Sequence, residues 1–277
     1  MLLVIAGYAG YSAYRHFVTQ ILTVPGCQAG TGTNALPLDF GQAADSATIA
    51  GVAAREHLPQ RALTIAYATA MQESKLENLD YGTDDSVGIF QQRPSEGWGT
   101  VAELENPVYS AAAFFGALVK VPNYTHLPVY QAAQDVQRSA DGSAYQQYAQ
   151  MGAALAAYYT ATPHAVTCWY DPATQAGQEG VSTRLNLTAA VRGLDGTFGQ
   201  PGEDGSAVAG TTIRSGKTGT FKVTAAGGWT VANWLLTHAS LYGITQLSYG
   251  GYQWTASLTE TAWQADPGGV SGSIVAS

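Results

Sequence analysis

The chain of 277 residues is long enough to form two domains, each with its own hydrophobic core. Only 12% of the residues are charged, while Ala, Gly, Thr and Tyr are plentiful, which is typical of a folded, secreted protein rather than a disordered one. The net charge of −8 argues against nucleic acid as a partner, because the 12 Lys and Arg residues are scattered and cannot neutralise a run of phosphates.

The beginning of the chain is apolar. Residues 2–14 carry no charged side chain, and Arg15 follows them. This run is shorter than the roughly 20 residues of a membrane-spanning helix, and it lacks the basic residues that usually precede the core of an export signal. We interpret residues 1–26 as an export signal or membrane anchor, and the alternative is a helix buried in a soluble protein.

Cys27 and Cys168 are the two cysteines of the sequence. Two cysteines are too few for a zinc site made of thiolates, and neither belongs to a Cys-x-x-Cys pair. In an exported protein they would form one disulfide that closes a long loop. The alternatives are two free thiols, or a lipid anchor at Cys27, because residues 24–26 faintly resemble a lipidation signal.

Two helices are predicted next. Small and apolar residues recur at helical spacing over residues 41–57, with Asp45 or Ser46 as the cap. A Leu-Pro pair then interrupts the pattern, and a second helix is expected over residues 59–77. That helix places Glu73 near its C-terminal end.

The position of Glu73 favours a role as an acid. A helix C-terminus carries partial negative charge, and an apolar wall would withhold solvation, so both effects favour the protonated carboxyl group. A glycosidic oxygen needs such a proton donor as it leaves. The alternative is that Glu73 is a solvated surface acid on an ordinary helix.

The residues around Glu73 follow a recognisable pattern. Gln72-Glu73-Ser74 is followed by Asn78, then by Gly88-Ile89-Phe90-Gln91 and Pro94. This stretch resembles the catalytic core of the lytic transglycosylases and their goose-type lysozyme relatives, over roughly residues 40–160. The resemblance implies a mainly helical, lysozyme-like domain at residues 27–170, in which Glu73 is the catalytic acid and base.

We expect the following residues to bind the glycan strand: Gln72, Ser74, Asp84, Asp85, Ser86, Gly88, Ile89, Phe90, Gln91, Trp98, Gln137 and Arg138. Sugar rings stack on indoles, so Trp98 is expected to form a subsite wall or, alternatively, part of the core. The family has a third motif, Ala-Tyr-Asn, which lines a sugar subsite. We expect its equivalent at residues 136–139, where Arg138 replaces the Asn.

The second part of the chain has a different composition. Residues 171–219 are rich in Gly, Thr and Ser and are predicted to be a linker. Residues 220–277 are predicted to form a small α+β accessory domain with strands at 221–223, 246–254 and 272–276 and a helix at 228–242. This domain is similar to a module found on secreted actinobacterial wall proteins, and we expect it to be non-catalytic. Residues 40–170 are therefore expected to cleave substrate alone.

The predicted fold class is α+β, with a mainly helical, lysozyme-like domain followed by the small accessory domain. The first functional hypothesis is a peptidoglycan lytic transglycosylase, which uses one carboxylate and no cofactor or metal. The second is a lysozyme-type hydrolase in which Asp84 or Asp85 orients a water molecule. The third is an inactive glycan-binding or assembly protein.

The expected partners follow from these hypotheses. They are peptidoglycan glycan strands and, through the N-terminal segment, a membrane, which gives an extracytoplasmic protein that is secreted or anchored at the cell envelope. The sequence leaves open whether the protein serves wall growth, a secretion or conjugation machinery, or a phage.

Overall fold

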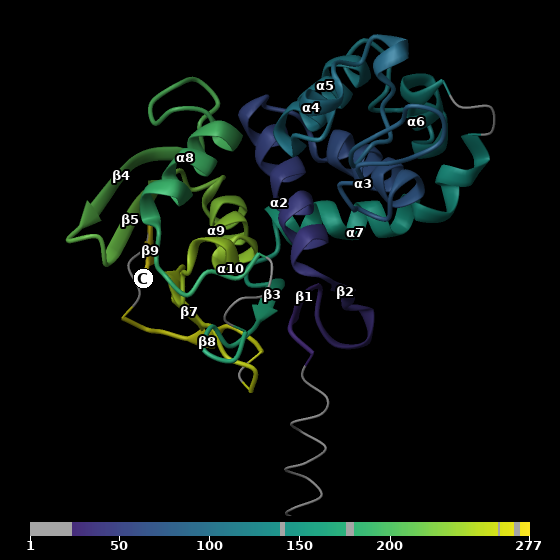
Figure 1. Cartoon of the computed structure of the whole chain (residues 1–277). Helices are drawn as coiled ribbons and strands as arrows, with labels where there is room; N and C mark the ends of the chain where they lie inside the picture. Colours follow the sequence, from purple (N-terminus) through teal and green to yellow (C-terminus); the bar gives the residue numbers. More distant parts are fainter. Residues whose placement is uncertain (1–23, 139–141, 176–179, 260, 269–271) are drawn as a thin grey trace, which may run out of the picture.

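The computed structural model describes residues 24–277 except 139–141, 176–179, 260 and 269–271. The predicted signal or anchor at residues 1–26 therefore lies almost entirely outside the described residues. The remainder confirms the predicted α+β class, with a helical lobe followed by a lobe built on a β-sheet (Figure 1). Within the described ranges, no helix is both long and apolar enough to cross a membrane.

Helices build the lobe that contains Glu73, joined by short 3-10 turns. Its elements are α2 (Phe40–Arg55), α3 (Gln60–Glu73), η2 (Pro94–Glu96), α4 (Val101–Leu104), α5 (Pro107–Leu118), α6 (Val129–Gln137), η3 (Gly142–Tyr148) and α7 (Ala149–Thr160). The side chain of Asn106 caps α5 by accepting the Val108 backbone N–H at 3.0 Å, and Pro107 occupies the first turn, where its missing N–H costs nothing.

The cap of α2 differs from the prediction. Asp39 accepts a hydrogen bond from the Gln42 backbone N–H at 2.7 Å, and the Gln42 side chain accepts one from the Asp39 N–H at 3.0 Å. The predicted caps Asp45 and Ser46 are wrong, because both lie buried inside the helix. Burial, together with the charge of Asp39, raises the pKa of the Asp45 carboxyl to about 8.

A small antiparallel sheet closes the helical lobe. It contains β1 (Gly26–Ala29), β2 (Leu36–Leu38) and β3 (Val166–Trp169) in the order β2-β1-β3, with η1 (Gly32–Asn34) between the first two strands. Cys27 lies directly opposite Cys168 in the β1–β3 ladder, and the predicted disulfide between them is confirmed. Such a bond is typical of proteins in an oxidising, extracytoplasmic compartment.

The second lobe is a six-stranded antiparallel sheet packed against helices. Its elements are α8 (Leu187–Phe198), β4 (Val208–Arg214), β5 (Thr218–Val223), α9 (Gly228–Thr237), α10 (Ala239–Tyr242), β6 (Gln246–Tyr249), β7 (Tyr252–Thr255), β8 (Gln264–Ala265) and β9 (Ser273–Ala276). The strand order is β4-β5-β9-β6-β7-β8. The strands expected near residues 221, 246–254 and 272–276 are all present, and Gly243 ends α10 in the left-handed conformation.

The predicted linker at residues 171–219 is wrong, because it contains α8 and β4. Leu187, Leu194 and Phe198 lie on one face of α8 and are buried. A Cβ added at Gly193 would lie 2.6 Å from the Trp234 ring, so this glycine permits the close packing of α8 on α9. The glycines that made the sequence resemble a linker here serve helix packing.

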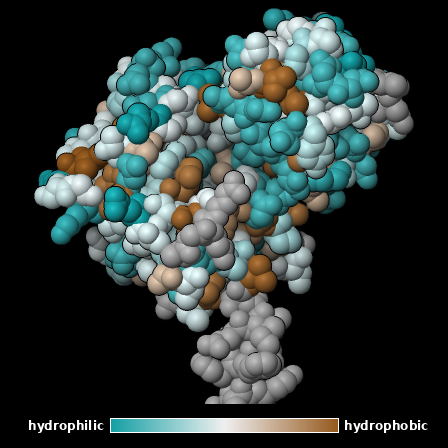
Figure 2. All heavy atoms as spheres, in the orientation of Figure 1, coloured by the Kyte–Doolittle hydropathy of each residue, from teal (hydrophilic) through white to brown (hydrophobic). Residues whose placement is uncertain are grey.

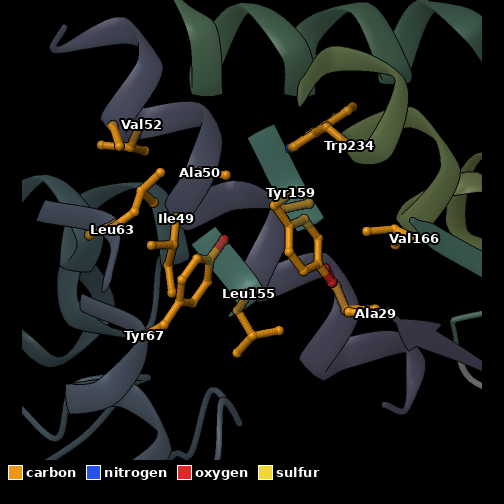
Figure 3. Close-up of a cluster of buried hydrophobic side chains, with 14 of the residues drawn as sticks. Ala29, Ile49, Ala50, Val52, Leu63, Tyr67, Leu155, Tyr159, Val166 and Trp234 are labelled. Carbon is orange, nitrogen blue, oxygen red and sulfur yellow. The ribbon is translucent and has the colours of Figure 1, made fainter. Parts of the chain in front are cut away.

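The two lobes share one hydrophobic core. Helix α2 lies between them, and Figure 3 shows Ile49 and Val52 of α2 in one cluster with Tyr159 of α7 and Trp234 of α9. Polar contacts cross the same boundary, since the Asn233 side-chain amide donates to the backbone carbonyl of Tyr159 at 3.1 Å. The predicted division at residue 170 therefore does not separate two independent cores.

Further hydrogen bonds join the second lobe to β3. Trp254 Nε1 donates to the Cys168 carbonyl at 2.7 Å, and Trp263 Nε1 donates to the Val166 carbonyl at 2.9 Å. Both indoles are buried, so these bonds satisfy polar groups that water cannot reach. On the outside, Figure 2 shows apolar residues as small separate spots on a mainly polar face.

Candidate active site around Glu73

The end of α3 presents Glu73 to the outside. The apolar residues of α3 are buried, while Glu73, in the last turn, is half-buried. The chain then leaves the helix through Lys75 and Leu76, both in the left-handed conformation, with φ of 61° and 69°. The backbone N–H groups of Ser74 and Leu76 both donate to the Ala70 carbonyl, which fixes the helix end on which the carboxyl group is mounted.

Tyr145 contacts the acid directly. Its hydroxyl donates to Glu73 Oε1 at 2.5 Å, the short distance expected for an O–H group bonded to a carboxylate. The Tyr145 side chain comes from η3 and is 2% exposed, so its position is fixed by packing. Because Oε1 is occupied by this donor, a proton on the Glu73 carboxyl would reside on Oε2.

The loop of residues 88–91 is held against the acid from two sides. Ser74 Oγ donates to the Ile89 carbonyl at 2.7 Å, and Gln137 Nε2 donates to the Phe90 carbonyl at 2.7 Å. Gly88 adopts φ of 78°, and a Cβ there would lie 2.3 Å from the Leu104 carbonyl. The motif glycine is thus required by both its conformation and its packing.

Several residues predicted to contact substrate are buried. Ile89 and Phe90 are fully buried, and Phe90 stacks on Phe114 with ring centroids 4.4 Å apart. Ser74 and Ser86 are also buried, and Ser86 Oγ donates to a carbonyl of its own turn. Buried side chains offer a surface ligand little contact area, so the structure favours packing roles for them, and their predicted contact with substrate stays a prediction.

Gln72 and Gln91 are half-buried beside the acid. Gln72 Oε1 accepts a hydrogen bond from Gln147 Nε2 at 3.3 Å, which joins α3 to η3. Gln91 Nε2 donates to the carbonyls of Tyr81 and Gly88, at 3.2 Å each. Both amides retain surface that a sugar could contact.

Asp84 and Asp85 both pair with Arg93. Asp85 Oδ1 accepts from Arg93 Nε at 2.9 Å, and Asp84 lies 3.4 Å from Arg93 Nη1. The Arg93 guanidinium, together with the Ser95 backbone N–H, lowers the pKa of the Asp85 carboxyl to about 2. These contacts hold the turn that contains the two aspartates.

Trp98 and Arg138 lie together on a neighbouring groove of about 680 Å³. Trp98 is half-buried, and its backbone carbonyl accepts a hydrogen bond from the Tyr109 hydroxyl at 3.2 Å. The indole therefore both packs on the core and faces the groove. Glu73 is not among the residues that line this groove.

The tyrosine that contacts Glu73 lies outside residues 136–139, where the sequence predicted the equivalent of the third motif. Residues 136–139 were expected to supply the Ala-Tyr-Asn equivalent, but Gln137 holds the loop of residues 88–91 instead. The tyrosine that meets Glu73 stands in Ala144-Tyr145-Gln146, which matches two of the three residues of that motif. The Ala-Tyr pair in the sequence was the signal that could have found it.

Among the described residues, no three His, Cys, Asp or Glu side chains gather closely enough to hold a metal ion. The candidate site thus consists of one half-buried carboxyl group, a buried phenol that is hydrogen-bonded to it, and neutral amides around them.

In comparisons with known proteins, no protein-family model matches the chain and no curated protein is significantly similar to it.

Proposed function

We propose that the protein is a peptidoglycan lytic transglycosylase that cleaves the β-1,4 bond of the glycan with Glu73 as its acid and base. The observation that carries the proposal is the 2.5 Å hydrogen bond from the Tyr145 hydroxyl to Glu73 Oε1. It fixes the carboxyl group at the end of α3, beside the loop of residues 88–91 that the sequence pattern pairs with the acid.

The proposed reaction has two steps. The proton on Glu73 Oε2 passes to the glycosidic oxygen as its bond to the sugar C1 breaks. The resulting carboxylate then takes the proton of the C6 hydroxyl of the same sugar, whose oxygen bonds to C1 and closes a 1,6-anhydro ring. Tyr145 donates to Oε1 throughout, which stabilises the carboxylate of the intermediate stage without competing for Oε2.

The arrangement of the other acids supports a single-carboxylate reaction over hydrolysis. A hydrolase would use Asp84 or Asp85 to orient water, but both carboxylates are bonded to Arg93. Asp85 accepts two further hydrogen bonds from Ser95, at 2.8 and 2.9 Å. Because these hydrogen bonds occupy the Asp85 carboxylate, it is better placed to hold the turn than to orient a water molecule.

The proposed setting is the cell envelope, where the protein is secreted or membrane-anchored through residues 1–26. Its disulfide fits this setting, since such a bond forms in an oxidising compartment. Glycan strands of peptidoglycan would be its partner there, in wall growth or in the opening of the wall for a secretion or conjugation machinery or a phage.

The deciding experiment is digestion of purified peptidoglycan, followed by mass analysis of the products. Wild-type protein should release fragments with 1,6-anhydro ends, and Glu73→Gln should lower the rate by at least about 10²–10⁴-fold, because the amide cannot give a proton. The matched control is Glu77→Gln, an exposed glutamate in the loop after α3, which should remain active.

Each other outcome selects another function. Products with ordinary reducing ends would identify a hydrolase, and a wild-type protein that binds glycan without cleaving it would identify a binding protein. Near-native activity in Glu73→Gln would show that the acid is misassigned.

A further inference from the structure

The groove that contains Trp98 and Arg138 combines an apolar floor with charged walls. Small side chains of α5, Ala113 and Ala117, form part of the floor, and Val136 of α6 adds to it. The indole of Trp98 forms one wall, and Arg138 lies at the end of α6. A groove of about 680 Å³ accommodates a ligand of several residues rather than a single ion.

Two cations that line this groove have no partner in the part of the chain that the structure describes. Within the described residues, neither Lys120 nor Arg138 makes an ion pair or a side-chain hydrogen bond. Two acids also line it: Glu96, which lies 3.6 Å from Arg93, and the exposed Asp135. The lining is therefore complementary to a ligand that carries carboxylates, and it leaves an acid for an amine.

The backbone at Arg138 adds a second observation. Arg138 is the C-cap of α6 with φ of 52° and ψ of 32°, a left-handed conformation that glycine usually occupies. A side chain at this position is strained, and such strain tends to occur where a side chain has a functional task. The preceding residue, Gln137, donates to the Phe90 carbonyl, so this end of α6 is tied to the loop beside Glu73.

We infer that this groove binds the peptide stem that branches from the glycan strand, an inference that rests on the proposed function. The stem carries free carboxylates for Arg138 and Lys120, small methyl side chains for the alanine floor and, where its third residue is a diamino acid, an amine for Asp135. An uncharged sugar would leave both cations unpaired. The groove thus selects glycan that still bears its peptides.

The test compares two substrates with one set of variants. The substrates are intact peptidoglycan and the same glycan after an amidase has removed its peptides. The double variant Arg138→Gly/Lys120→Ala removes both cations, and the glycine suits the left-handed backbone, so the fold is preserved. Lys222→Ala, at an exposed position on β5, is the matched control for loss of positive charge.

Cleavage of peptide-bearing glycan should fall about tenfold in the double variant, because charge-assisted bonds to carboxylates are lost. Cleavage of the stripped glycan should fall far less than that, and Arg138→Lys should restore part of the loss. An equal loss on both substrates, or no loss on the peptide-bearing one, would overturn the inference.

A binding measurement separates failure of this inference from failure of the proposed function. If wild-type protein cleaves neither substrate, calorimetry with a soluble disaccharide-tetrapeptide and with the bare disaccharide tests the groove by itself. Preference for the peptide-bearing ligand that disappears in the double variant supports the groove. Equal affinity for both ligands refutes it.

Discussion

Tyr145 illustrates at the residue scale how one buried hydroxyl defines the site. Tyr145→Phe keeps the ring that fills the core and removes the hydroxyl that donates a hydrogen bond to Glu73 Oε1. Bonds to charged groups contribute about 1.5–3 kcal/mol, so the cleavage rate should fall by roughly 10- to 100-fold. Turnover of purified peptidoglycan measures this loss.

The control for that variant is Tyr148→Phe, which removes a phenol that accepts a hydrogen bond from Lys75 at the surface. It should retain wild-type turnover and a wild-type melting temperature. Equal turnover in Tyr145→Phe and wild type would mean that the phenol does not assist the acid.

Asp45 allows a prediction about pH. Its pKa in the folded protein is raised to about 8 by burial, against an ordinary value of 3.8. The folded state therefore binds this proton more tightly than the unfolded state does. The contribution of protonated Asp45 to the free energy of unfolding is fully present below about pH 4, and it is lost as the pH rises toward 8. Asp45→Asn should remove that loss and unfold at higher denaturant concentration than wild type at pH 8.

Urea unfolding at pH 4 and at pH 8 checks this expectation. The two proteins should be similarly stable at pH 4, and the variant should gain about 2–5 kcal/mol relative to wild type at pH 8. The exposed Asp135→Asn serves as a control for the loss of a surface carboxylate. A gain that is the same at both pH values would show that Asp45 does not titrate in this range.

At the residue scale, residues with fixed spacing predicted that Glu73 lies at the end of a helix, but the sequence did not show which side chains face outward. Ile89 and Phe90 are fully buried in the core, and their burial cannot be read from the spacing of the pattern. Tyr145 was missed because its bond to Glu73 joins residues 72 positions apart.

The disulfide acts at the scale of elements, because it joins β1 to β3. It connects residues separated by 141 positions, at a pair directly opposed in the ladder. Cys27→Ala/Cys168→Ala should lose about 2–5 kcal/mol of stability through the greater freedom of the unfolded chain. Urea unfolding measures the loss.

Reduction of the wild-type protein should lower its free energy of unfolding as much as the double substitution does, and reductant should not change the stability of the double variant. If reductant does not change the stability of the wild-type protein although its thiols are accessible, β1 and β3 stay paired without the disulfide.

Elements with strong end signals were predicted well from the sequence, whereas elements hidden by composition were not. Asn106-Pro107 marks the start of α5 because both residues satisfy the needs of a first helical turn. Helix α8 was missed because its Gly and Thr residues resemble a linker until the buried spacing of Leu187, Leu194 and Phe198 is known. The cap of α2 was predicted wrongly because Asp45 is of a residue type that often caps helices, but it lies inside this helix, which begins at Phe40.

At the scale of the whole molecule, the shared core predicts cooperative unfolding. Removing residues 176–277 would expose the face of α2 that packs on α9, and it would leave the carbonyls of Val166 and Cys168 without their indole donors. Residues 24–175 alone should therefore be poorly folded and inactive, which reverses the expectation from sequence that residues 40–170 act alone.

Circular dichroism and fluorescence of the full chain should report one coincident thermal transition. The fragment should lack that transition and bind a hydrophobic dye. A fragment that melts cooperatively near the wild-type temperature and cleaves peptidoglycan would show that the helical lobe is self-sufficient.

The 141-residue spacing of the two cysteines also bears on the order in which the protein can be made. A chain that emerges N-terminus first exposes Cys27 long before Cys168 exists, and the inner face of α2 stays uncovered until α9 follows. During that interval the nascent chain presents a reactive thiol and an apolar helix face to its surroundings. Oxidants and holding chaperones at the site of export would therefore govern its yield more than the stability of the finished fold.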